Sequence, residues 1–572
     1  MNKFLPILSW LPSYNKSSLV GDLSAGITVG IMLVPQGMAY AMLAGLPPIY
    51  GLYAATVPLL IYAILGTSRQ LAVGPVAMVS LLVASGVGAL AEHGTTEFVS
   101  LCLLLAMMVG LIQLIMGLGR LGFLVNFLSH PVIAGFTSAA ALIIGFSQLK
   151  HLLGLDIPRA KIHKIIVSVF ENIGQVNVPT LLIGIGGIVT ILSLKRVNKR
   201  LPSPLIVVVL GLAVVSFLGL DSKGVDLVRE VPSGLPAFAI PVFSTDMIMS
   251  LLPIALTIAL ISYVESYAVA KAIQNKHKDY ELDPNQELIG LGAANIFGSL
   301  FSAFPVTGGF SRSAVNDQAG AKTGIAAIIS AALVVLALMF LTPYFYNLPK
   351  AVLAAIIMVA VFGLIDFKEA VHLWKTDRYD FLAFAITFLA TLFVGIEQGI
   401  LIGIAVSLAV ILYKISYPHV AELEQIPMSP TFRNIERFEN LVSNKEAIIL
   451  RYDAPLFFAN CASFKEKILS KITERPEAKR VVLDVSGISH VDSSAIHILK
   501  DLHKILKDKK ILLQFADVKG PIRDLFQRNG LHDKFGKDNF FLSVKDAADS
   551  SETKVISFQQ EFLFQTNTSQ LN

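Results

Sequence analysis

Long apolar stretches dominate the first two-thirds of the chain, and short polar segments separate them. A helix needs about 20 mostly apolar residues to cross a bilayer. Seven candidate spans precede a polar stretch at 221–245 and seven follow it, near 21–42, 49–66, 75–91, 98–118, 123–148, 178–194, 203–220, 246–270, 286–304, 310–320, 323–342, 348–365, 379–395 and 397–417. The pattern predicts a cytosolic segment at 1–20 and a transmembrane domain at 21–417, built from two halves at about 21–220 and 246–417.

The pattern changes after Pro418, where short apolar runs alternate with amphipathic ones. Strands and helices alternate in the prediction, with strands at 447–452, 480–485 and 510–515 and helices at 461–473, 493–508 and 521–529. Such alternation indicates a small α/β domain, here at 418–550. We expect residues 551–572 to form a flexible tail.

Composition supports this division. The whole chain is 54% hydrophobic and only 15% charged, whereas about 25% of residues are charged in soluble proteins. Residues 1–417 carry 24 Lys and Arg and 20 Asp and Glu, and the much shorter remainder carries 22 and 21. Both parts are nearly balanced in charge, so nothing favours nucleic acid as a partner.

Several function classes lack support in the sequence. The two cysteines, Cys102 and Cys461, fall in different predicted compartments, so we expect no disulfide. The chain has no glycine-rich P-loop, which argues against an ATP-driven pump. Its 11 histidines form no pair at metal-ligand spacing. We therefore expect neither a cofactor nor enzymatic activity.

Basic residues in the short loops predict the orientation, because Lys and Arg accumulate on the cytosolic side of a membrane. With both termini cytosolic, three basic loops fall inside, at 195–200, 271–278 and 368–378. Four further basic residues fall outside and run against the rule, namely Lys150, Arg159, Lys161 and Lys164. The balance favours cytosolic termini.

An odd number of spans in each half implies that the halves are inverted relative to each other, which is typical of transporters. Corresponding spans are interrupted in both halves, at 74–77 (GPVA) and at 304–313 (FPVTGGFSRS). Pro and Gly prevent a helix at the start of each run, and helix-forming residues follow. Two half-helices with facing N-termini would concentrate free N–H groups and positive dipole ends, which favours a bound anion. Ordinary kinks in packed spans are the alternative.

Two ionisable residues inside the predicted spans are functional candidates, since a charge at membrane depth is costly. Arg312 would add a fixed positive charge to the half-helix dipole, although it could instead pair with Asp317. Glu265 lies in an apolar helix, where a carboxyl group can exchange a proton near neutral pH. The alternative for Glu265 is a permanent salt bridge with Arg312 or Lys322.

Two weaker signals complete the candidate chemistry. Gln36 and Tyr40 lie one helical turn apart and share a face, where they would offer an amide donor and an aromatic wall to an anion. Pro35 is expected to open that helix locally and free a carbonyl. In the tail, Asp492-Ser493-Ser494 precedes a predicted helix, and we favour a helix cap over a phosphorylation or docking corner.

Four segments together resemble a known family. Residues 21–55, 66–82 and 281–323 are similar to sulfate permease (SulP) transporters, whose animal relatives include prestin and pendrin. Residues 481–496 (VVLDVSGISHVDSSAI) resemble the STAS domain, a relative of the anti-sigma-factor antagonists. The resemblance covers nearly the whole chain.

This resemblance implies a fold of 14 spans in two inverted repeats of seven, with a core domain that carries the anion and moves against a gate domain in an elevator-like cycle. It also implies a homodimer, with the STAS domains helping to join the protomers. The implied anion site lies between the third and tenth spans, with candidate residues Gln36, Tyr40, Val76, Ala77, Ser311 and Arg312. Glu265 matches a carboxylate linked to proton coupling in related symporters, and Ser494 matches a serine that is phosphorylated in the antagonist proteins.

Three functional hypotheses follow. The first is proton-coupled uptake of a small oxyanion, sulfate above all, across the cell (inner) membrane. The second is sodium-coupled bicarbonate transport or chloride/bicarbonate exchange by the same fold. The third is a membrane-anchored signalling protein whose cytosolic STAS domain docks a regulator. The interrupted spans and Arg312 favour transport over signalling, and a charged arginine does not suit the neutral base of a uracil-type permease.

Overall fold

The chain folds into two compact units, Met1–Ser407 and Leu408–Asn572. The computed structural model describes residues 5–123, 129–157, 162–197 and 202–550. The division falls inside helix α18 (Ile396–Ser416), slightly before the boundary predicted at 417. The predicted tail at 551–572 lies outside the described residues.

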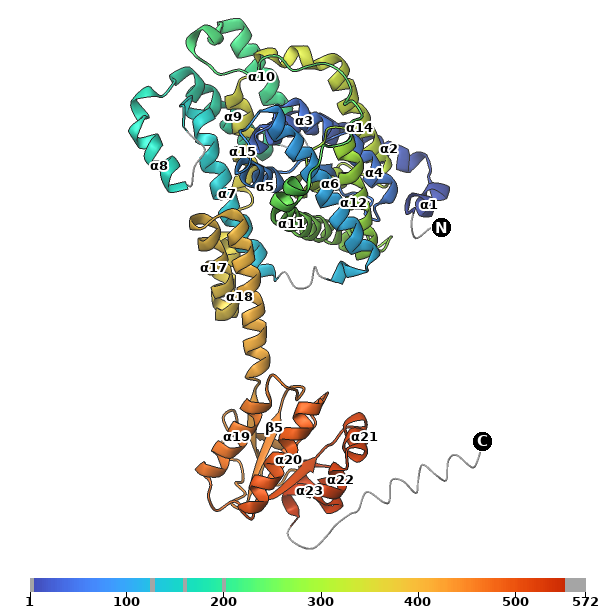
Figure 1. Cartoon of the computed structure of the whole chain (residues 1–572), viewed down its shortest axis with the longest axis vertical. Helices are drawn as coiled ribbons and strands as arrows, with labels where there is room; N and C mark the ends of the chain where they lie inside the picture. The colour runs from blue at the N-terminus through green and yellow to red at the C-terminus, as the bar shows by residue number, and fades with distance from the viewer. Residues whose placement is uncertain (1–4, 124–128, 158–161, 198–201, 551–572) are drawn as a thin grey trace. The chain divides into compact units, whose positions relative to one another are not determined.

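The first unit is almost entirely helical (Figure 1). The short strands in its described ranges are β1 (Val73–Gly74) and β2 (Thr307–Gly308). Its helices, besides α18, are α1 (Ile7–Trp10), α2 (Lys16–Ala44), α3 (Ile49–Tyr53), α4 (Val57–Leu65), α5 (Ala77–Gly88), α6 (Thr96–Leu118), α7 (His130–Leu153), α8 (Ile162–Glu171), α9 (Val178–Val197), α10 (Ser203–Leu218), α11 (Thr245–His277), α12 (Pro284–Leu300), α13 (Phe310–Gln318), α14 (Ile325–Leu336), α15 (Lys350–Phe362), α16 (Phe367–Thr376) and α17 (Arg378–Phe393).

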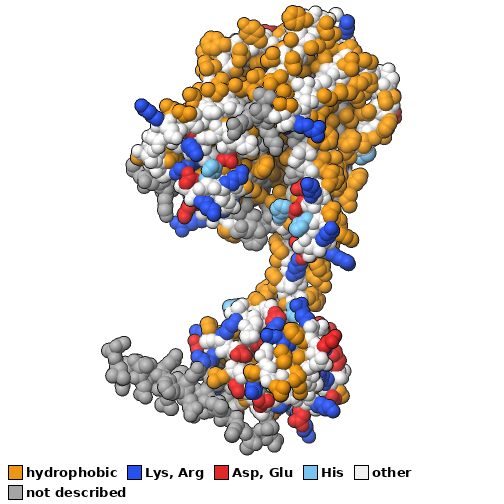
Figure 2. Space-filling model, turned by 180° about the vertical axis from the view of Figure 1, so that it is seen from behind, with side chains coloured by type: hydrophobic (Ala, Val, Ile, Leu, Met, Phe, Trp, Pro, Cys, Tyr) orange, Lys and Arg blue, Asp and Glu red, His pale blue; other side chains and the backbone are white. Residues whose placement is uncertain are grey.

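The surface of this unit is suited to lipid. Among the described residues, eight helical segments are long and apolar enough to cross a membrane, and Ile49–Leu65, Ala77–Gly88 and Ser203–Leu218 are shorter apolar segments. Hydrophobic side chains cover most of the visible face, and charged side chains gather at only a few places (Figure 2). Phe217, for example, is 89% exposed. The predicted membrane domain is confirmed, while the count of 14 spans stays a prediction.

The helices pack in two groups, each drawn from both halves of the sequence. In the core group, α2 packs against α5 and α14, α12 packs against α4 and α6, and α11 packs against α6 and α13. In the gate group, α7 packs against α9, α15 and α17, and α10 packs against α9. Helices from the two halves therefore pair with each other, as expected for halves that form one domain together.

Two fully buried carboxylates join the halves within the core group. Asp22 on α2 accepts hydrogen bonds of 2.6–2.9 Å from the backbone and hydroxyl of residues 322–323. Glu287 on α12 accepts bonds of 2.6–3.1 Å from Tyr62 and from residues 67–68. Each carboxylate thus fixes a loop from the opposite half, which satisfies its oxygens away from water.

Helix α2 differs from the expectation in one respect. It runs without interruption through Pro35, which is buried, so the predicted local opening does not form. Proline removes only its own N–H and crowds one preceding carbonyl. Close packing of α2 against α5 and α14 keeps the rest of the helix in register.

The second unit is built on a six-stranded sheet in the order β4-β3-β5-β6-β7-β8. Strands β5 to β8 are parallel, and β3 is antiparallel to both β4 and β5. The strands are β3 (Val420–Gln425), β4 (Phe432–Asn434), β5 (Ala447–Tyr452), β6 (Arg480–Asp484), β7 (Leu512–Ala516) and β8 (Phe540–Phe541). The three predicted strands are confirmed as the central ones, and β3, β4 and β8 extend the sheet.

Helices cover both faces of this sheet. Alternate residues of a strand point to opposite faces, so Ile448 and Leu450 pack on one side while Ala447 and Ile449 pack on the other. The first side is covered by α19 (Cys461–Glu474), α20 (Ser493–Asp508), α21 (Gly520–Arg528) and α22 (Leu531–Phe535), and the second by α23 (Val544–Asp549). Burial on both faces explains the continuous apolar runs of the central strands.

Candidate functional site

The two interrupted spans meet in the middle of the core group. Strands β1 and β2 pair antiparallel, with Val73 opposite Gly308 and Gly74 opposite Thr307. The N–H of Gly309 extends the pairing by donating to the carbonyl of Ala72 over 3.1 Å. Non-helical backbone inside a membrane domain needs internal hydrogen-bond partners, and here each break supplies the partners of the other.

A helix begins directly after each strand. Val76 precedes α5 and Gly309 precedes α13, and neither helix start has a side-chain cap. The first backbone N–H groups of a helix have no partner within it. The two starts lie close together, because a Cβ atom on Gly309 would stand 3.2 Å from Cγ1 of Val76. The pair therefore presents uncapped N–H groups and two positive dipole ends to one place, as the sequence predicted.

Polar side chains of α11 and α12 hold β2 in position. The hydroxyls of Ser266 and Thr307 lie 2.6 Å apart, and the N–H of Gly308 donates to Ser266 over 2.8 Å. Asn295 receives a 2.9 Å bond from the N–H of Val306. The sequence pattern does not mark these residues, although Thr307 lies inside the interrupted run and Asn295 is an isolated amide in an apolar span.

Two residues of α13 fix the segment that leads into β1. Ser313 accepts a 2.9 Å bond from the N–H of Ala72, and Asn316 donates a 2.9 Å bond to the carbonyl of Gln70. Both side chains are buried. They follow Arg312 on α13 by one and four residues, so the arginine is held on a fixed helix rather than on a loop.

Arg312 is 2% exposed and donates one hydrogen bond, to the carbonyl of Pro75 at the other break. Its Nε and Nη2 atoms are buried and have no hydrogen-bond partner among the described residues. Within the described part of the chain, no carboxylate lies within 4.0 Å of the guanidinium. Asp317, the alternative partner, instead pairs with His277 and with Lys276, the latter at 3.4 Å. A buried guanidinium with unused donors is chemically suited to bind an anion.

Two glycines make room for this guanidinium. A Cβ atom on Gly309 would stand 3.0 Å from Nη2 of Arg312, and one on Gly74 would stand 3.4 Å from it. Gly74 also has φ of +156°, a conformation that other residues rarely adopt. The close approach of Arg312 therefore explains Gly74 and Gly309, two of the three glycines in the interrupted runs.

Glu265 lies on α11 and faces the same region. It is half-buried, and its Oε2 atom is buried without a hydrogen-bond partner. Its charge and that of Arg312 interact electrostatically, but among the described residues it forms no ion pair within 4.0 Å. The predicted alternatives, salt bridges to Arg312 or Lys322, are not formed in this conformation.

The remaining candidates surround the two helix starts. Tyr40 on α2 interacts electrostatically with Arg312, and Leu33 on the same helix would lie 3.6 Å from a Cβ atom on Gly74. Gln36 lies between those two positions, is 5% exposed, and has an unpartnered Oε1 atom. The structure therefore brings these two α2 residues to the breaks.

The residues of the helix starts differ in exposure. Val76 and Ala77 are each 6% exposed. Ser311, at the second position of α13, is exposed. Its backbone N–H belongs to the uncapped helix start, whereas its side chain forms no hydrogen bond with another described residue that would support a direct role.

Other predicted features lie elsewhere. Asp492 caps α20 by accepting from the N–H of Ala495 over 2.8 Å, as the simpler interpretation of that corner predicted. Ser494 is half-buried on the first turn of α20, and its modification stays a prediction. No group of three or more metal-ligating side chains occurs in the described ranges.

Comparisons with known proteins agree with this geometry. Residues 19–387 match the sulfate permease family model, and residues 440–547 match the STAS domain model. The chain belongs to the sulfate permease family. It is 41% identical over 567 residues to sulfate transporter 4.1, chloroplastic, of Arabidopsis thaliana, covering 96% of this chain and 82% of that one. It is 34% identical over 576 residues to high affinity sulfate transporter 2 of Stylosanthes hamata, covering 97% and 87%.

Solved structures show the same fold. The overall structure of SLC26A9 matches with a TM-score of 0.88 and 28% identity, covering all of this chain and 94% of that one. The transmembrane domain of the cyanobacterial bicarbonate transporter BicA matches with a TM-score of 0.60 and 23% identity over 69% of this chain. The protein is thus a multi-pass membrane protein with a C-terminal STAS domain, as its sequence predicted.

Proposed function

We propose that the protein is a secondary active transporter of a small inorganic anion, most directly sulfate, which binds beside Arg312 between the starts of α5 and α13. The observation that carries the proposal is the buried guanidinium with two unused nitrogen donors. An oxyanion would supply acceptors for those donors and for the uncapped N–H groups at the same time. The names of the most similar relatives support sulfate as the anion.

The arrangement of charges supports a role in coupling for Glu265. It faces the site from α11 without a fixed partner, so its protonation state can change as the anion binds or leaves. Sulfate carries two negative charges, and a proton on Glu265 would remove one repulsive charge from the loaded site. We propose that this carboxyl group carries the co-transported proton.

The packing of the helices supports alternating access. Asp22, Glu287 and the β1–β2 pair tie the core group together, so it can move as one body. The gate group packs through its own contacts among α7, α9, α15 and α17. We propose that the core group carries the anion past the gate group in an elevator-like movement.

Uptake of labelled sulfate into proteoliposomes with purified protein tests the proposal. With an inward proton gradient we expect accumulation above equilibrium. Arg312→Ala is expected to abolish saturable uptake, and Arg312→Lys to retain part of it, because a lysine keeps the charge but not the fork of donors. Exposed Arg196→Ala is the control for loss of a positive charge. Normal uptake by well-folded Arg312→Ala would rule out the site.

The coupling is tested separately. Glu265→Gln should leave sulfate exchange intact but abolish the accumulation of sulfate driven by the proton gradient. Exposed Glu281→Gln should change neither the exchange nor the accumulation. Accumulation that still follows the gradient in Glu265→Gln would exclude this residue. If the wild-type protein moves no sulfate but takes up bicarbonate with sodium, or exchanges it for chloride, the second hypothesis replaces the first.

We further propose the assembly and location implied by the family. The protein would act as a homodimer in the cell (inner) membrane, with the STAS domain in the cytosol and open to a regulatory partner there. Ser494 is the position at which modification would act. Cross-linking of intact membranes and accessibility of the STAS domain to added protease check the first two points.

A further inference from the structure

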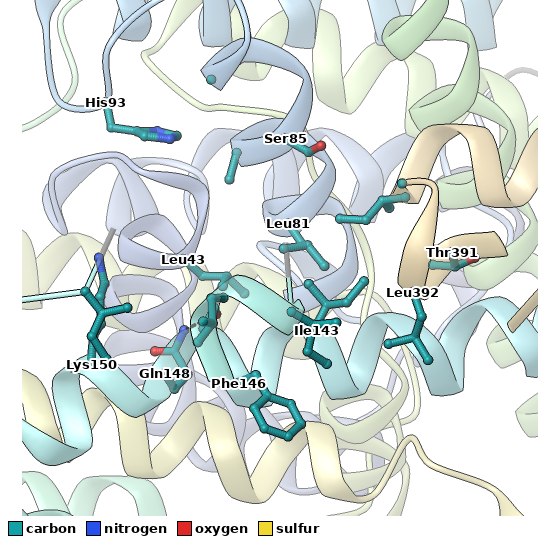
Figure 3. Close-up of a pocket in the computed structure, with 18 of the residues that line it drawn as sticks. Leu43, Leu81, Ser85, His93, Ile143, Phe146, Gln148, Lys150, Thr391 and Leu392 are labelled. Carbon is teal, nitrogen blue, oxygen red and sulfur yellow. Dashed lines mark hydrogen bonds between the residues drawn. The ribbon is translucent and has the colours of Figure 1, made fainter. Parts of the chain in front are cut away.

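A cavity of about 440 Å³ lies between the core and gate groups (Figure 3). Its core side is formed by the ends of α2 and α5, and its gate side by α7 and the junction of α17 and α18. Helix α8 contributes two isoleucines. In Figure 3, His93 and Lys150 lie towards one side of the cavity, and Thr391 and Leu392 lie towards the other.

The cavity is lined by two helices that also carry residues of the proposed anion site. Met42 and Leu43 line it and follow Tyr40 on α2 by two and three residues. Leu81 also lines it and lies one helical turn after Ala77 on α5. The cavity therefore extends away from the helix starts along the two helices that form them.

The ionisable side chains that line the described part of the cavity are all basic. Lys150, His151 and His93 line it, and within the described part of the chain no aspartate or glutamate does. Most of the other lining residues are apolar. Low-dielectric walls focus the field of a fixed positive charge into the space between them. The histidines can donate N–H groups even when neutral.

The location of these charges is unusual for a membrane protein. The predicted orientation puts residues 150–164 on the outer side, and Lys150, His151 and Ile157 of this stretch line the cavity. Lys150 and Lys164 are two of the basic residues that run against the positive-inside rule. Lys150 lines the cavity, whereas exposed Lys164 on α8 does not. Lys150 therefore differs from Lys164 in bringing its positive charge to the cavity.

We propose that this cavity is a second anion-binding subsite, in which Lys150, with His93 and His151, holds a small inorganic anion on the outer side before it reaches Arg312. The subsite rests on the proposed transport function for its purpose. It differs from the Arg312 site in position and residues. The proposed subsite should bind anions at Lys150 even when transport is blocked.

Cysteine labelling tests the charge preference without relying on transport. Ser85 lines the cavity and is exposed, while native Cys102 and Cys461 are 0% and 4% exposed. In full-length Ser85→Cys, an anionic sulfonatoethyl methanethiosulfonate should react faster than its cationic trimethylammonioethyl counterpart. Adding Lys150→Gln should lower the ratio of the two rates by about fivefold or more, and external sulfate should slow labelling only when Lys150 is present.

The matched control distinguishes a local site from general surface charge. Lys164→Gln removes the same charge from the same side, and we expect it to leave the ratio of rates unchanged. An unchanged ratio in Lys150→Gln, or an equal fall in Lys164→Gln, overturns the subsite. These results hold whether or not the wild-type protein transports sulfate, so failure of the proposed function would be seen separately.

Transport kinetics then test the role of the subsite. Lys150→Gln should raise the KM for external sulfate about fivefold to tenfold with less than a twofold change in maximal rate. Lys150→Arg should restore the wild-type KM within about twofold. If Lys150→Gln instead lowers only the maximal rate, the residue has a structural role and the subsite is not on the transport path.

Discussion

Replacing Arg312 with methionine should make the empty protein more stable while removing its response to the anion. The side chain is 2% exposed, so its charge is almost wholly out of water. Two of its nitrogens are buried without partners. A buried cation without hydrogen-bond partners lowers the free energy of unfolding of the empty protein. An anion that binds to it is expected to raise that free energy again.

The magnitude follows from these groups. A buried donor without a partner costs about 1–3 kcal/mol, and Arg312 has two. Arg312→Met removes both but leaves the carbonyl of Pro75 without its bond, a cost of about 1–3 kcal/mol. Methionine fills much of the space of the arginine stem. The net expectation is a gain of about 1–3 kcal/mol in the free energy of unfolding.

Thermal unfolding of the detergent-solubilised full chain measures both effects. Sulfate at 100 times its Kd should stabilise the wild-type protein by about 2.7 kcal/mol, and should not stabilise Arg312→Met. Exposed Arg196→Met on α9 should leave the response to sulfate unchanged. A lower melting temperature for empty Arg312→Met, together with a preserved response to sulfate, would refute the reasoning. It would mean that Arg312 is structural and that the anion binds elsewhere.

Three further outcomes are expected. Glu287→Gln should lower the free energy of unfolding by roughly 3 kcal/mol, since an amide cannot accept from all the donors around that carboxylate. Melting curves would show this loss of stability, and exposed Glu281→Gln should change the melting temperature little. Gly309→Ala should weaken sulfate binding about tenfold or more by displacing the guanidinium of Arg312, which titration of the thermal response would measure, and unchanged affinity would contradict the close approach. Burial lowers the pKa of His532 below its usual 6.5, so the unfolded chain binds more protons and the STAS domain should lose stability as pH falls below about 6.5. Hydrogen exchange in the full chain should show this loss reduced in His532→Phe, and an equal loss in both would exclude the residue.

The sequence predicted those parts of the fold that have a periodic or compositional signal. Long apolar stretches located the membrane domain, and alternating runs located the central strands of the STAS sheet. Strands β3, β4 and β8 were missed because they lack a continuous apolar run. Strand β3 (VAELEQ) contains two glutamates, and the edge strands β4 and β8 are only three and two residues long. The continuity of α2 through Pro35 depends on packing, which local propensity does not contain.

The sequence predicted those residues of the candidate site whose type is rare inside membrane spans. Arg312 stands out because a charge in an apolar span is costly, and Pro and Gly mark the breaks beside it. Ser266 and Thr307 were missed because single hydroxyls are common in helices and carry no pattern. Their role depends on contact between segments far apart in the chain, which a single sequence does not reveal.

The pairing of β1 with β2 also has a consequence for how the protein is made. The hydrogen bonds that complete the site join residues separated by 241 and 246 positions in the chain. Contacts of such long range form late in folding. During synthesis, the first half must enter the bilayer with the polar edge of β1 unpaired, an unfavourable state in lipid. We expect this half to be the segment that quality-control proteases recognise when synthesis stalls, and the second half, supplied as a separate chain, to rescue it.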